Sequence, residues 1–385
     1  MRMTGFRLLG GVVLCVLLAS GCLQQEEEDK RDRWIELGQV PAARNTGASN
    51  HSPMAVSNGK VFIGTNDGVW TRPLSAGTWS RSGLNGMKVQ EILAHPTRNG
   101  VLFAAGEYSS GTQVPMARST DGGMTWTNAA TSVFNSFENM YYVFYDLEAR
   151  PGHPDTLYAN MSGNVINVSI DGGANWHLQQ GYAEPGFNYP CVIHVPATDN
   201  AHVYQGCEAP LDFAWIARQT ISANDAANLS GFEYLVYQDT SGDLLIENRR
   251  PNALTSAKSS PLALYAGIEG GLLKIEADGD FKWLMRQTQA HTEYAYVSAI
   301  WVDPADAKHI IFGGFDKGPA PADFTLYETF DEGKAITRIQ SPRRFTFPWI
   351  EQIVDTGEDL LVAISDNTDQ DSSTLDPLYV FRLAY

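Results

Sequence analysis

One eight-residue pattern occurs twice in this chain and constrains the fold more than any other feature. Residues 119–126 read STDGGMTW and residues 169–176 read SIDGGANW, so both follow the form S-x-D-G-G-x-(T/N)-W. The two copies lie 50 residues apart, a period typical of repeat arrays and of β-propellers. The pattern therefore predicts a chain built from several similar units.

The residue types in the pattern favour a tight turn followed by an anchored strand. An Asp side chain accepts hydrogen bonds from nearby backbone N–H groups, and glycine adopts positive φ at little cost. The tryptophan that ends each copy, Trp126 or Trp176, is a large apolar side chain suited to burial at the start of a strand. We expect each copy to form the turn between two adjacent strands.

The octapeptide resembles the Asp-box, or BNR repeat, of the sialidase-like, xyloglucanase-like and sortilin-like β-propellers. The residues that carry the resemblance are Ser119, Asp121, Gly123, Trp126, Ser169, Asp171, Gly173 and Trp176. The resemblance implies that these residues shape a structural turn rather than an active site, because many unrelated activities share this turn.

A second regularity continues along the chain where the octapeptide is absent. A short β-rich segment that ends in small residues recurs at 61–64, 101–106, 157–159, 203–206, 264–267, 310–313 and 360–363. Units of four strands at roughly this spacing are typical of a propeller. We therefore predict an all-β fold, a single seven-bladed β-propeller of four-stranded antiparallel blades over residues 33–385.

The two ends of this region predict how the ring closes. The last β-rich segment, residues 378–383, leaves the seventh blade one strand short, and residues 34–38 (WIELG) resemble an outer strand that precedes the first full blade. Pairing these two segments would complete blade seven and cover its edge. This closure by an N-terminal strand favours seven blades over six or eight.

The first residues have the pattern of an export signal. Arg2 and Arg7 precede an apolar run over residues 8–18, and small residues then lead to Cys22. This arrangement resembles the lipobox of bacterial lipoproteins, whereas the alternatives are an ordinary secretory signal or a short membrane anchor. The resemblance implies residues 1–21 as a signal peptide and lipidation of Cys22. It also implies residues 22–32 as a flexible acidic tether, and an exported protein on the outer membrane if the host is Gram-negative.

The chain is acidic, with 27 Lys and Arg against 44 Asp and Glu and a formal net charge of −17 at pH 7. Such a surface repels nucleic acid and anionic lipid. We therefore expect no nucleic-acid partner and membrane contact through the lipid anchor only. We also expect a monomer. Solubility is the alternative reason for the acidity.

Two of the four cysteines remain outside the signal and the lipidation position. Cys191 and Cys207 flank two β-rich segments, and a hairpin folded about Asp199 sets them opposite each other. In an oxidising compartment such a pair is expected to form a structural disulfide. A catalytic role is less favoured, because no partner histidine is evident for either cysteine.

Strand alternation in a four-stranded blade separates two kinds of connection. With the strands named a to d, the a–b and c–d turns lie on one face of the ring, and the b–c and d–a loops lie on the other. Variable loops on a rigid scaffold usually carry binding. The candidate ligand-binding residues of that loop face are Glu107, Tyr142, Glu208, Arg249, Glu269, Glu293, Tyr296, Asp316, Trp349 and Glu351.

Carboxylates and aromatic rings on one face suit a carbohydrate, and they suit a peptide or small-ligand pocket equally well. For any single ring the alternative is a place in the core between blades. For any single acid it is a solvated position on a loop.

The family resemblance raises two enzyme classes. A sialidase-like site needs an early Arg-Ile-Pro motif and three arginines, whereas residues 43–46 read ARNT and arginine is sparse on the loop face. A xyloglucanase-like site lies between two propellers, and this sequence predicts one. A glycoside hydrolase that uses loop carboxylates, for example Glu107 with Glu269 or Asp316 with Glu351, stays open as the alternative, with the catalytic residues unassigned.

Metal and cofactor motifs are weak in this sequence. The histidines are not spaced as a metal site, and nucleophile-elbow, zinc-protease, P-loop and dinucleotide motifs are absent. The acidic run over residues 366–371 (DNTDQD) suits Ca²⁺ but lacks the glycine and distal glutamate of a full calcium-binding loop. We expect no cofactor, with calcium as the open alternative.

Taken together, these features predict a lipid-anchored propeller of the cell envelope that binds an envelope protein or a glycan without catalysis. In this it resembles the photosystem assembly-factor propellers, which bind proteins and carry out no chemistry.

Overall fold

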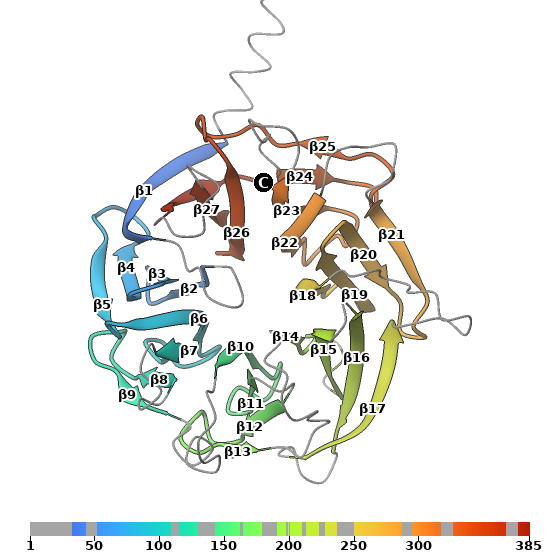
Figure 1. Ribbon diagram of the computed structural model, residues 1–385, viewed down its shortest axis with the longest axis horizontal. Coiled ribbons are helices and arrows are strands. Elements are labelled where there is room, and N and C mark those ends of the chain that lie inside the picture. Colours follow the sequence, from blue (N-terminus) through green and yellow to red (C-terminus); the bar gives the residue numbers. More distant parts are fainter. Residues whose placement is uncertain are drawn as a thin grey trace, which may run out of the picture.

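A computed structural model describes most of the chain as β-strands arranged in a ring. The described residues are 33–43, 52–108, 115–129, 143–161, 165–178, 191–197, 199, 201–209, 213–222, 228–236, 250–286, 295–316, 326–366 and 376–385. Their strands form seven four-stranded sheets around a central axis (Figure 1). The predicted all-β, seven-bladed propeller is therefore confirmed. Within these ranges no helix is long and apolar enough to cross a membrane.

The first four blades follow one another along the chain, and their strands are named here from the axis outward. Blade 1 consists of β2 (Met54–Ser57), β3 (Lys60–Thr65), β4 (Gly68–Pro73) and β5 (Ser80–Gly83). Blade 2 consists of β6 (Met87–Ala94), β7 (Leu102–Tyr108), β8 (Met116–Ser119) and β9 (Thr127–Asn128). Blade 3 consists of β10 (Phe144–Ala149), β11 (Leu157–Met161), β12 (Val165–Ser169) and β13 (His177–Leu178). Blade 4 consists of β14 (Cys191–His194), β15 (His202–Ala209), β16 (Phe213–Ile221) and β17 (Leu229–Val236).

The last three blades complete the ring, and the seventh takes its outer strand from the start of the described chain. Blade 5 consists of β18 (Pro251–Ala257), β19 (Ser260–Ile268), β20 (Gly271–Ile275) and β21 (Phe281–Arg286). Blade 6 consists of β22 (Ala295–Val302), β23 (Ile310–Asp316), β24 (Leu326–Thr329) and β25 (Thr337–Arg338). Blade 7 consists of β26 (Pro348–Asp355), β27 (Leu360–Asp366), β28 (Pro377–Leu383) and β1 (Trp34–Ala43).

The seven segments that end in small residues are the second strands of the seven blades. Glycine is needed there because the innermost strand of the next blade approaches closely. A Cβ on Gly64 would lie 2.7 Å from Val89 Cγ1, and one on Gly206 would lie 2.8 Å from Pro251 Cβ. The regularity in the sequence therefore marks the places where neighbouring blades meet.

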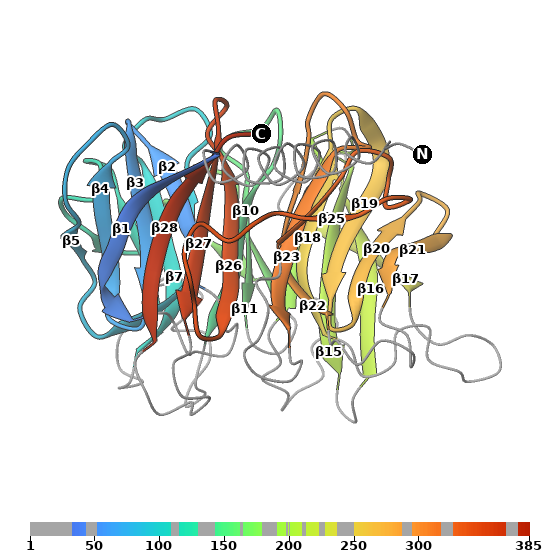
Figure 2. The same cartoon turned by 90° about the horizontal axis from the view of Figure 1, so that it is seen from above.

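The ring closes as the sequence predicts, through an N-terminal strand. β1 pairs antiparallel with β28, from Trp34 opposite Leu383 to Ala43 opposite Pro377, and Figure 2 shows the two strands side by side. The strand is longer than the predicted segment 34–38, because the pairing continues past two irregularities in register. The Trp34 ring meets Phe381 edge to face at 5.8 Å between centroids, and its Nε1–H donates to the Gln340 carbonyl at 2.9 Å.

A buried charge cluster holds the start of β1 against blade 6. The two terminal nitrogens of Arg33 donate to the two carboxylate oxygens of Glu328 at 2.9 and 3.0 Å. His309 Nε2 lies 3.2 Å from the same carboxylate, and its Nδ1 lies 3.3 Å from Asp303. Arg33 also donates to the Ala384 carbonyl at 2.8 Å, so this cluster ties both ends of the described ring together.

The two octapeptides adopt the same hydrogen-bonded turn between the third and fourth strands of blades 2 and 3. Ser119 Oγ accepts the Gly123 N–H at 2.9 Å and donates to Asp121 at 2.9 Å. Asp121 in turn accepts the N–H groups of Met124 and Thr125 at 3.0 and 2.9 Å. Ser169 and Asp171 make the equivalent bonds in blade 3.

Blade 6 carries a related turn without the full sequence pattern. Thr329 replaces the serine, donates to Asp331 at 3.0 Å and accepts the Gly333 N–H at 2.9 Å. A hydroxyl, an aspartate and a glycine are thus sufficient for the turn.

The tryptophan of each octapeptide extends between two blades. Trp176 is buried in the core between blades 2 and 3, and Trp126 packs into the core between blades 1 and 2. Trp126 Nε1–H also donates to the Ser82 carbonyl of blade 1 at 3.2 Å. The octapeptide therefore closes its own hairpin and fastens that blade to the preceding one.

Alanine substitutions at the two adjacent glycines of the first octapeptide separate these two roles. Both glycines have positive φ, but a Cβ on Gly122 meets nothing within 4 Å, whereas one on Gly123 lies 2.6 Å from Phe62 of blade 1. We expect Gly122→Ala to lower the free energy of unfolding by about 1 kcal/mol. Gly123→Ala should cost about 1–3 kcal/mol more, because overpacking is added to strain. Chemical denaturation measures both, and equal losses would contradict the close contact between blades.

Five of the seven innermost strands contain a one-residue bulge at the same level of the ring. The extra residues are Gln90, Tyr145, Asn252, Ser298 and Glu351. An innermost strand is also the edge of its sheet, so its outward N–H groups need partners from elsewhere. Side chains at or beside the bulges are hydrogen-bond partners for the backbone of the next blade. For example, Asp146 accepts the Ile193 N–H at 2.7 Å.

Candidate functional site

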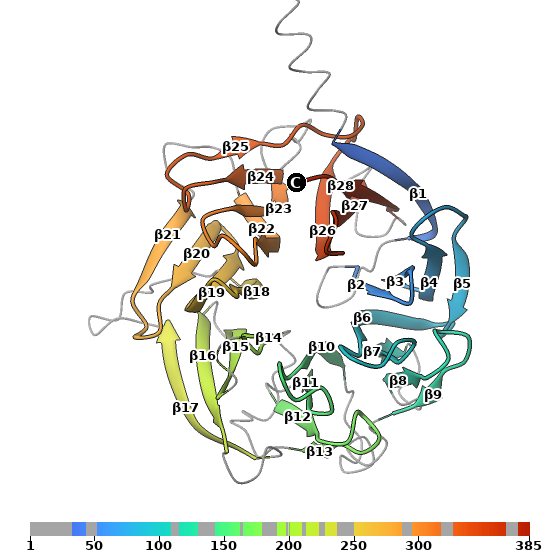
Figure 3. The same ribbon diagram turned by 180° about the vertical axis from the view of Figure 1, so that it is seen from behind.

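The ring presents a loop face, where the b–c and d–a connections lie, and a turn face, where the a–b and c–d turns lie. Figures 1 and 3 view the ring from these two sides. Because β1 is a fourth strand, it begins at the turn face, and the C-terminal end of the chain lies at the same face (Figure 2). The predicted ligand-binding residues that are described can be located against this frame.

Glu107 and two of its neighbours lie at the loop-face end of the central axis. Glu107 is near the end of β7 and forms an ion pair with Lys88, near the start of β6, at 3.3 Å. Burial, and to a smaller extent the negative charge of Glu107, raise the pKa of Tyr145 to about 12, although the charge of Arg250 acts in the opposite direction. Glu107 comes from blade 2, Tyr145 from blade 3, and Arg250 directly precedes blade 5, so residues of three blades interact here.

Tyr296 and Trp349, two predicted ligand-binding residues, lie together at the same end of blades 6 and 7. Their rings meet edge to face at 5.3 Å between centroids, and Phe315 stacks on Trp349 at 4.9 Å. The Tyr296 hydroxyl donates to Asn252 Oδ1 of blade 5 at 2.7 Å. We name Asn252, Tyr296, Phe315 and Trp349 the mouth cluster. Glu269, another predicted ligand-binding residue, forms a β-bridge with Tyr296 of this cluster.

Glu351 follows Trp349 by two residues in the sequence, but its side chain is buried. It is the extra residue of the β26 bulge and is 1% exposed. One carboxylate oxygen accepts the Ser52 N–H of blade 1 at 2.9 Å, and the other accepts the Ser365 hydroxyl. Its carboxylate therefore contributes to the joint between blades 7 and 1.

The remaining predicted positions lie outside the described residues. They are Tyr142, Arg249, Glu293, the side chains of Glu208 and Asp316, Cys22 with residues 1–32, and most of the acidic run 366–371. Asp366 itself is described, and its Oδ1 accepts the N–H groups of Thr346 and Phe347 at 2.8 Å each. That carboxylate oxygen thus holds the chain that enters β26.

A cavity of about 430 Å³ follows the axis between the innermost strands. Its lining includes five carboxylates, namely Glu91, Asp146, Glu148, Glu351 and Asp355. Sequence reasoning identified Glu351 but missed the other four, because it considered the loops and the starts of the innermost strands, and these four lie further along those strands. Among the described residues, no group of three or more His, Cys, Asp or Glu side chains is arranged to hold a metal ion.

One carboxyl group of this cavity, that of Glu91, has a strongly raised pKa. Burial raises the pKa of Glu91 to about 8, and the negative charge of Glu148 contributes to the increase. At pH 7 Glu91 is therefore mostly protonated. Glu148, whose side chain is 29% exposed, lies 3.0 Å from His194 Nδ1.

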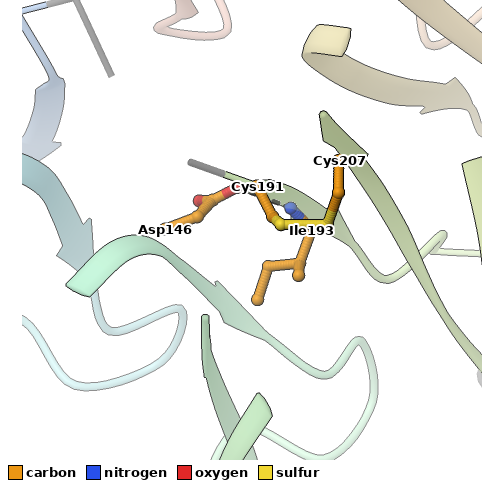
Figure 4. Close-up of a disulfide and its surroundings, with 4 residues drawn as sticks. All are labelled: Asp146, Cys191, Ile193 and Cys207. Carbon is orange, nitrogen blue, oxygen red and sulfur yellow. Dashed lines mark hydrogen bonds between the residues drawn. A yellow bond between two sulfur atoms is a disulfide. The ribbon is translucent and has the colours of Figure 1, made fainter. Parts of the chain in front are cut away.

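A disulfide joins the first two strands of blade 4. Cys191 and Cys207 are directly opposite in the register of β14 and β15, as the predicted hairpin about Asp199 requires, and their sulfur atoms are bonded. Figure 4 shows the bond beside Ile193, whose N–H donates to Asp146 of blade 3. The innermost strand of blade 4 is thus held both within its blade and to its neighbour.

The arrangement of the blades has counterparts among solved structures. YCF48 bound to D1 peptide is 10% identical, covers 92% of this chain and 97% of its own, and superposes with a TM-score of 0.58. YCF48 from Cyanidioschyzon merolae is 13% identical, with coverages of 91% and 98% and a TM-score of 0.57. The chain shares their β-propeller fold.

A third similar structure is the GH74 xyloglucanase from Xanthomonas campestris, at 14% identity and a TM-score of 0.57. It covers 90% of this chain, which spans 55% of the enzyme's own length. No protein-family model and no curated protein matches the sequence. At these sequence identities the similarity shows a shared fold.

Proposed function

We propose that this protein is a lipid-anchored binding propeller of the cell envelope that recognises a protein or glycan at its loop face. The mouth cluster carries this proposal. Its three rings lie edge to face or stacked, and Asn252 holds the Tyr296 hydroxyl at 2.7 Å. Rigid aromatic side chains beside a few placed polar groups are the usual composition of a binding surface.

A binding role needs the loop face to point away from the membrane, and the position of β1 supports this orientation. Arg33 is fixed at the turn face by Glu328 and the Ala384 carbonyl. A tether over residues 22–32 would therefore leave from the turn face. With Cys22 acylated, the loop face would point away from the membrane and toward other envelope components.

Among the two ligand classes, a protein segment is favoured. The loop face carries the mouth cluster and also both signs of charge, in the ion pair of Glu107 with Lys88 and in Arg250, and this combination suits a peptide with mixed side chains. A propeller of the same fold, YCF48, has been solved bound to D1 peptide. A glycan would use the same rings, so the test must separate the two classes.

Replacing Trp349 by alanine should reduce partner binding at least tenfold, because the stacked ring leaves the mouth cluster. The measurement is recovery of partner from solubilised envelope on the immobilised protein, with a thermal-shift panel of plant, bacterial and animal oligosaccharides in parallel. Trp79→Ala is the matched control, since Trp79 is also half-buried but precedes β5 at the turn face. Equal loss in both variants would contradict binding at the loop face, and a saccharide shift abolished by Trp349→Ala would assign a glycan.

A glycoside hydrolase is the second candidate, favoured by one observation. Glu91, with a pKa of about 8, lies near a second carboxyl group, that of Glu148, and a carboxyl group with a raised pKa beside another is an arrangement that glycosidases use. Against it, Glu91 is 9% exposed and accepts the N–H of Ile92 at 2.9 Å, so it belongs to the cavity wall. We expect no release of reducing sugar from xyloglucan; release abolished by Glu91→Gln would overturn the binding role.

A further inference from the structure

Three side chains at the turn-face end of the axial cavity form a chain of hydrogen bonds. Glu148 Oε1 lies 3.0 Å from His194 Nδ1, and His194 Nε2 lies 2.9 Å from Ser256 Oγ. Glu148, His194 and Ser256 are each the last or second-last residue of β10, β14 and β18, the innermost strands of blades 3, 4 and 5. A nucleophilic triad has this order: a carboxylate beside one ring nitrogen of an imidazole, and a hydroxyl beside the other.

The partners of the imidazole determine its tautomer. An ionised carboxylate only accepts hydrogen bonds, so Nδ1 of His194 carries the proton that it donates to Glu148. In a neutral imidazole Nε2 then carries no proton and can accept the Ser256 hydroxyl, which lies 2.9 Å away.

These three groups differ from the other polar side chains of the cavity. Asp146, Glu351 and Ser298 bond to backbone groups of the next blade and so hold the ring together. Within the described parts of the chain, the hydrogen bonds of Glu148 and His194 instead run between side chains. A network that satisfies no backbone group contributes little that an apolar contact could not replace, and its polarity calls for another explanation.

The triad is held rigidly. Three residues before His194, the disulfide of Cys191 fixes β14 to β15, and one residue before it the Ile193 N–H is bound by Asp146 of β10. The imidazole is therefore positioned between blades 3 and 5 by a covalent bond and by a charged hydrogen bond. Such support by neighbouring groups is what a working catalytic group needs.

The triad borders the axial cavity: Glu148 lines it, and His194 and Ser256 adjoin Glu148 in the chain of hydrogen bonds. The side chains of His194 and Glu148 are 13% and 29% exposed, and Ser256 is half-buried. Glu148 and the neighbours of Ser256, Leu254 and Thr255, line the cavity of about 430 Å³, a volume within the range of small-molecule sites. Aliphatic side chains complete this part of the lining: Val56, Leu93 and Val354.

We propose that Ser256, His194 and Glu148 form an acyl-transfer site that hydrolyses small carboxylic esters whose acyl group enters the axial cavity. This activity lies at the other end of the axis from the mouth cluster, so it goes beyond the proposed binding function and does not rest on it.

The reaction needs no group beyond the ester and water. Ser256 Oγ attacks the ester carbonyl carbon as its proton moves to His194 Nε2, and the bond to the alcohol oxygen breaks as that oxygen takes the proton. Water then attacks the acyl-serine, His194 takes a water proton and returns it to Ser256 Oγ, and a carboxylic acid leaves. β14 and β18 are sheet edges, whose outward N–H groups are the kind of donor that stabilises the intermediate oxyanion.

A fluorophosphonate probe tests the proposal on the full-length protein, since it labels only activated serines. We expect a covalent adduct that peptide mapping places on Ser256, and hydrolysis of p-nitrophenyl acetate that Ser256→Ala abolishes. Glu148→Gln should lower the hydrolysis rate by about 10³–10⁴-fold through the wrong imidazole tautomer. Ser80→Ala, at an exposed serine of β5, is the matched control and should leave both readouts unchanged.

Mapping the adduct on the unmodified protein needs no variant, so the test stands even if Ser256→Ala fails to fold. The proposal is overturned if the native protein labels no faster than the urea-denatured protein, or if the adduct maps to another serine. It is also overturned if folded Ser256→Ala hydrolyses the ester at the rate of the unmodified protein.

Discussion

Glu328→Gln should destabilise the ring by about 3 kcal/mol, because removing one member of a buried ion pair leaves the others without compensation. The Glu328 side chain is 7% exposed, binds Arg33 through both oxygens and lies 3.2 Å from His309. The loss falls on the joint that holds β1, so the ring is expected to open there first. Chemical denaturation of the two proteins measures the difference.

The control for this substitution is Glu233→Gln. Glu233 pairs with Arg218 at 2.8 Å, but its side chain is 60% exposed, so water screens the pair. We expect a cost of less than about 1 kcal/mol there. Similar losses at Glu328 and Glu233 would mean that the closure cluster adds no more than a surface ion pair.

The same cluster makes stability depend on pH in two directions. Burial alone would raise the pKa of Glu328, but hydrogen bonds from His309 and Arg33 hold it at about 2 instead of 4.5. Its contribution is therefore present above about pH 4.5 and is lost as the pH falls toward 2. Burial opposes protonation of His309, yet hydrogen bonds to Glu328 and Asp303 raise its pKa above 6.5. Its contribution is therefore full below pH 6.5 and is lost as the pH rises from 6.5 through the raised value. Unfolding measured from pH 2 to 9 should show both losses, and both should be smaller in Glu328→Gln.

Removing the disulfide by Cys191→Ser with Cys207→Ser should lower the free energy of unfolding by about 3 kcal/mol. The two cysteines are 16 residues apart, and a bond that closes a loop of this length restricts the unfolded chain by about that amount. Denaturant melts with and without dithiothreitol measure the effect.

The double variant serves as its own control, because reductant has no disulfide to break in it. Unfolding of the unmodified protein should therefore shift with dithiothreitol, and that of the double variant should not. An unmodified protein that is indifferent to reductant would show that the bond contributes nothing to stability.

The fold could be predicted in detail because its signals are local and repeated. Each small-residue segment marks a second strand, since glycines such as Gly64 and Gly206 allow the next blade to approach. Each octapeptide encodes its turn within eight residues, from Ser119 to Trp126 in the first copy. The number of blades follows from the two end segments that lack a partner of their own, because they pair with each other as β1 and β28.

The candidate site could be predicted only in part, because it depends on features that one strand does not reveal. Strand direction identifies the loop face, and Tyr296 and Trp349 do lie together there. Glu351, two residues after Trp349, is instead buried, because a bulge at that residue redirects the side chains that follow.

The triad is missed by sequence reasoning for a different reason. His194 lies 46 residues from Glu148 and 62 from Ser256 in the sequence. They come together only because each stands at the same end of the innermost strand in one of three consecutive blades. A comparison of the last residues of those strands, blade by blade, is the signal that could have found them.

Recognition of an envelope component by the loop face is tested most directly by photocrosslinking in cells. A benzophenone amino acid is placed at Lys88, which is 41% exposed at the loop face, and separately at Met124, which is 73% exposed in a turn of the opposite face. Benzophenone inserts into C–H bonds of proteins and glycans alike, so either partner class is captured. We predict a discrete adduct from position 88 and none from position 124; an adduct from position 124 alone, or from neither position, would contradict binding at the loop face.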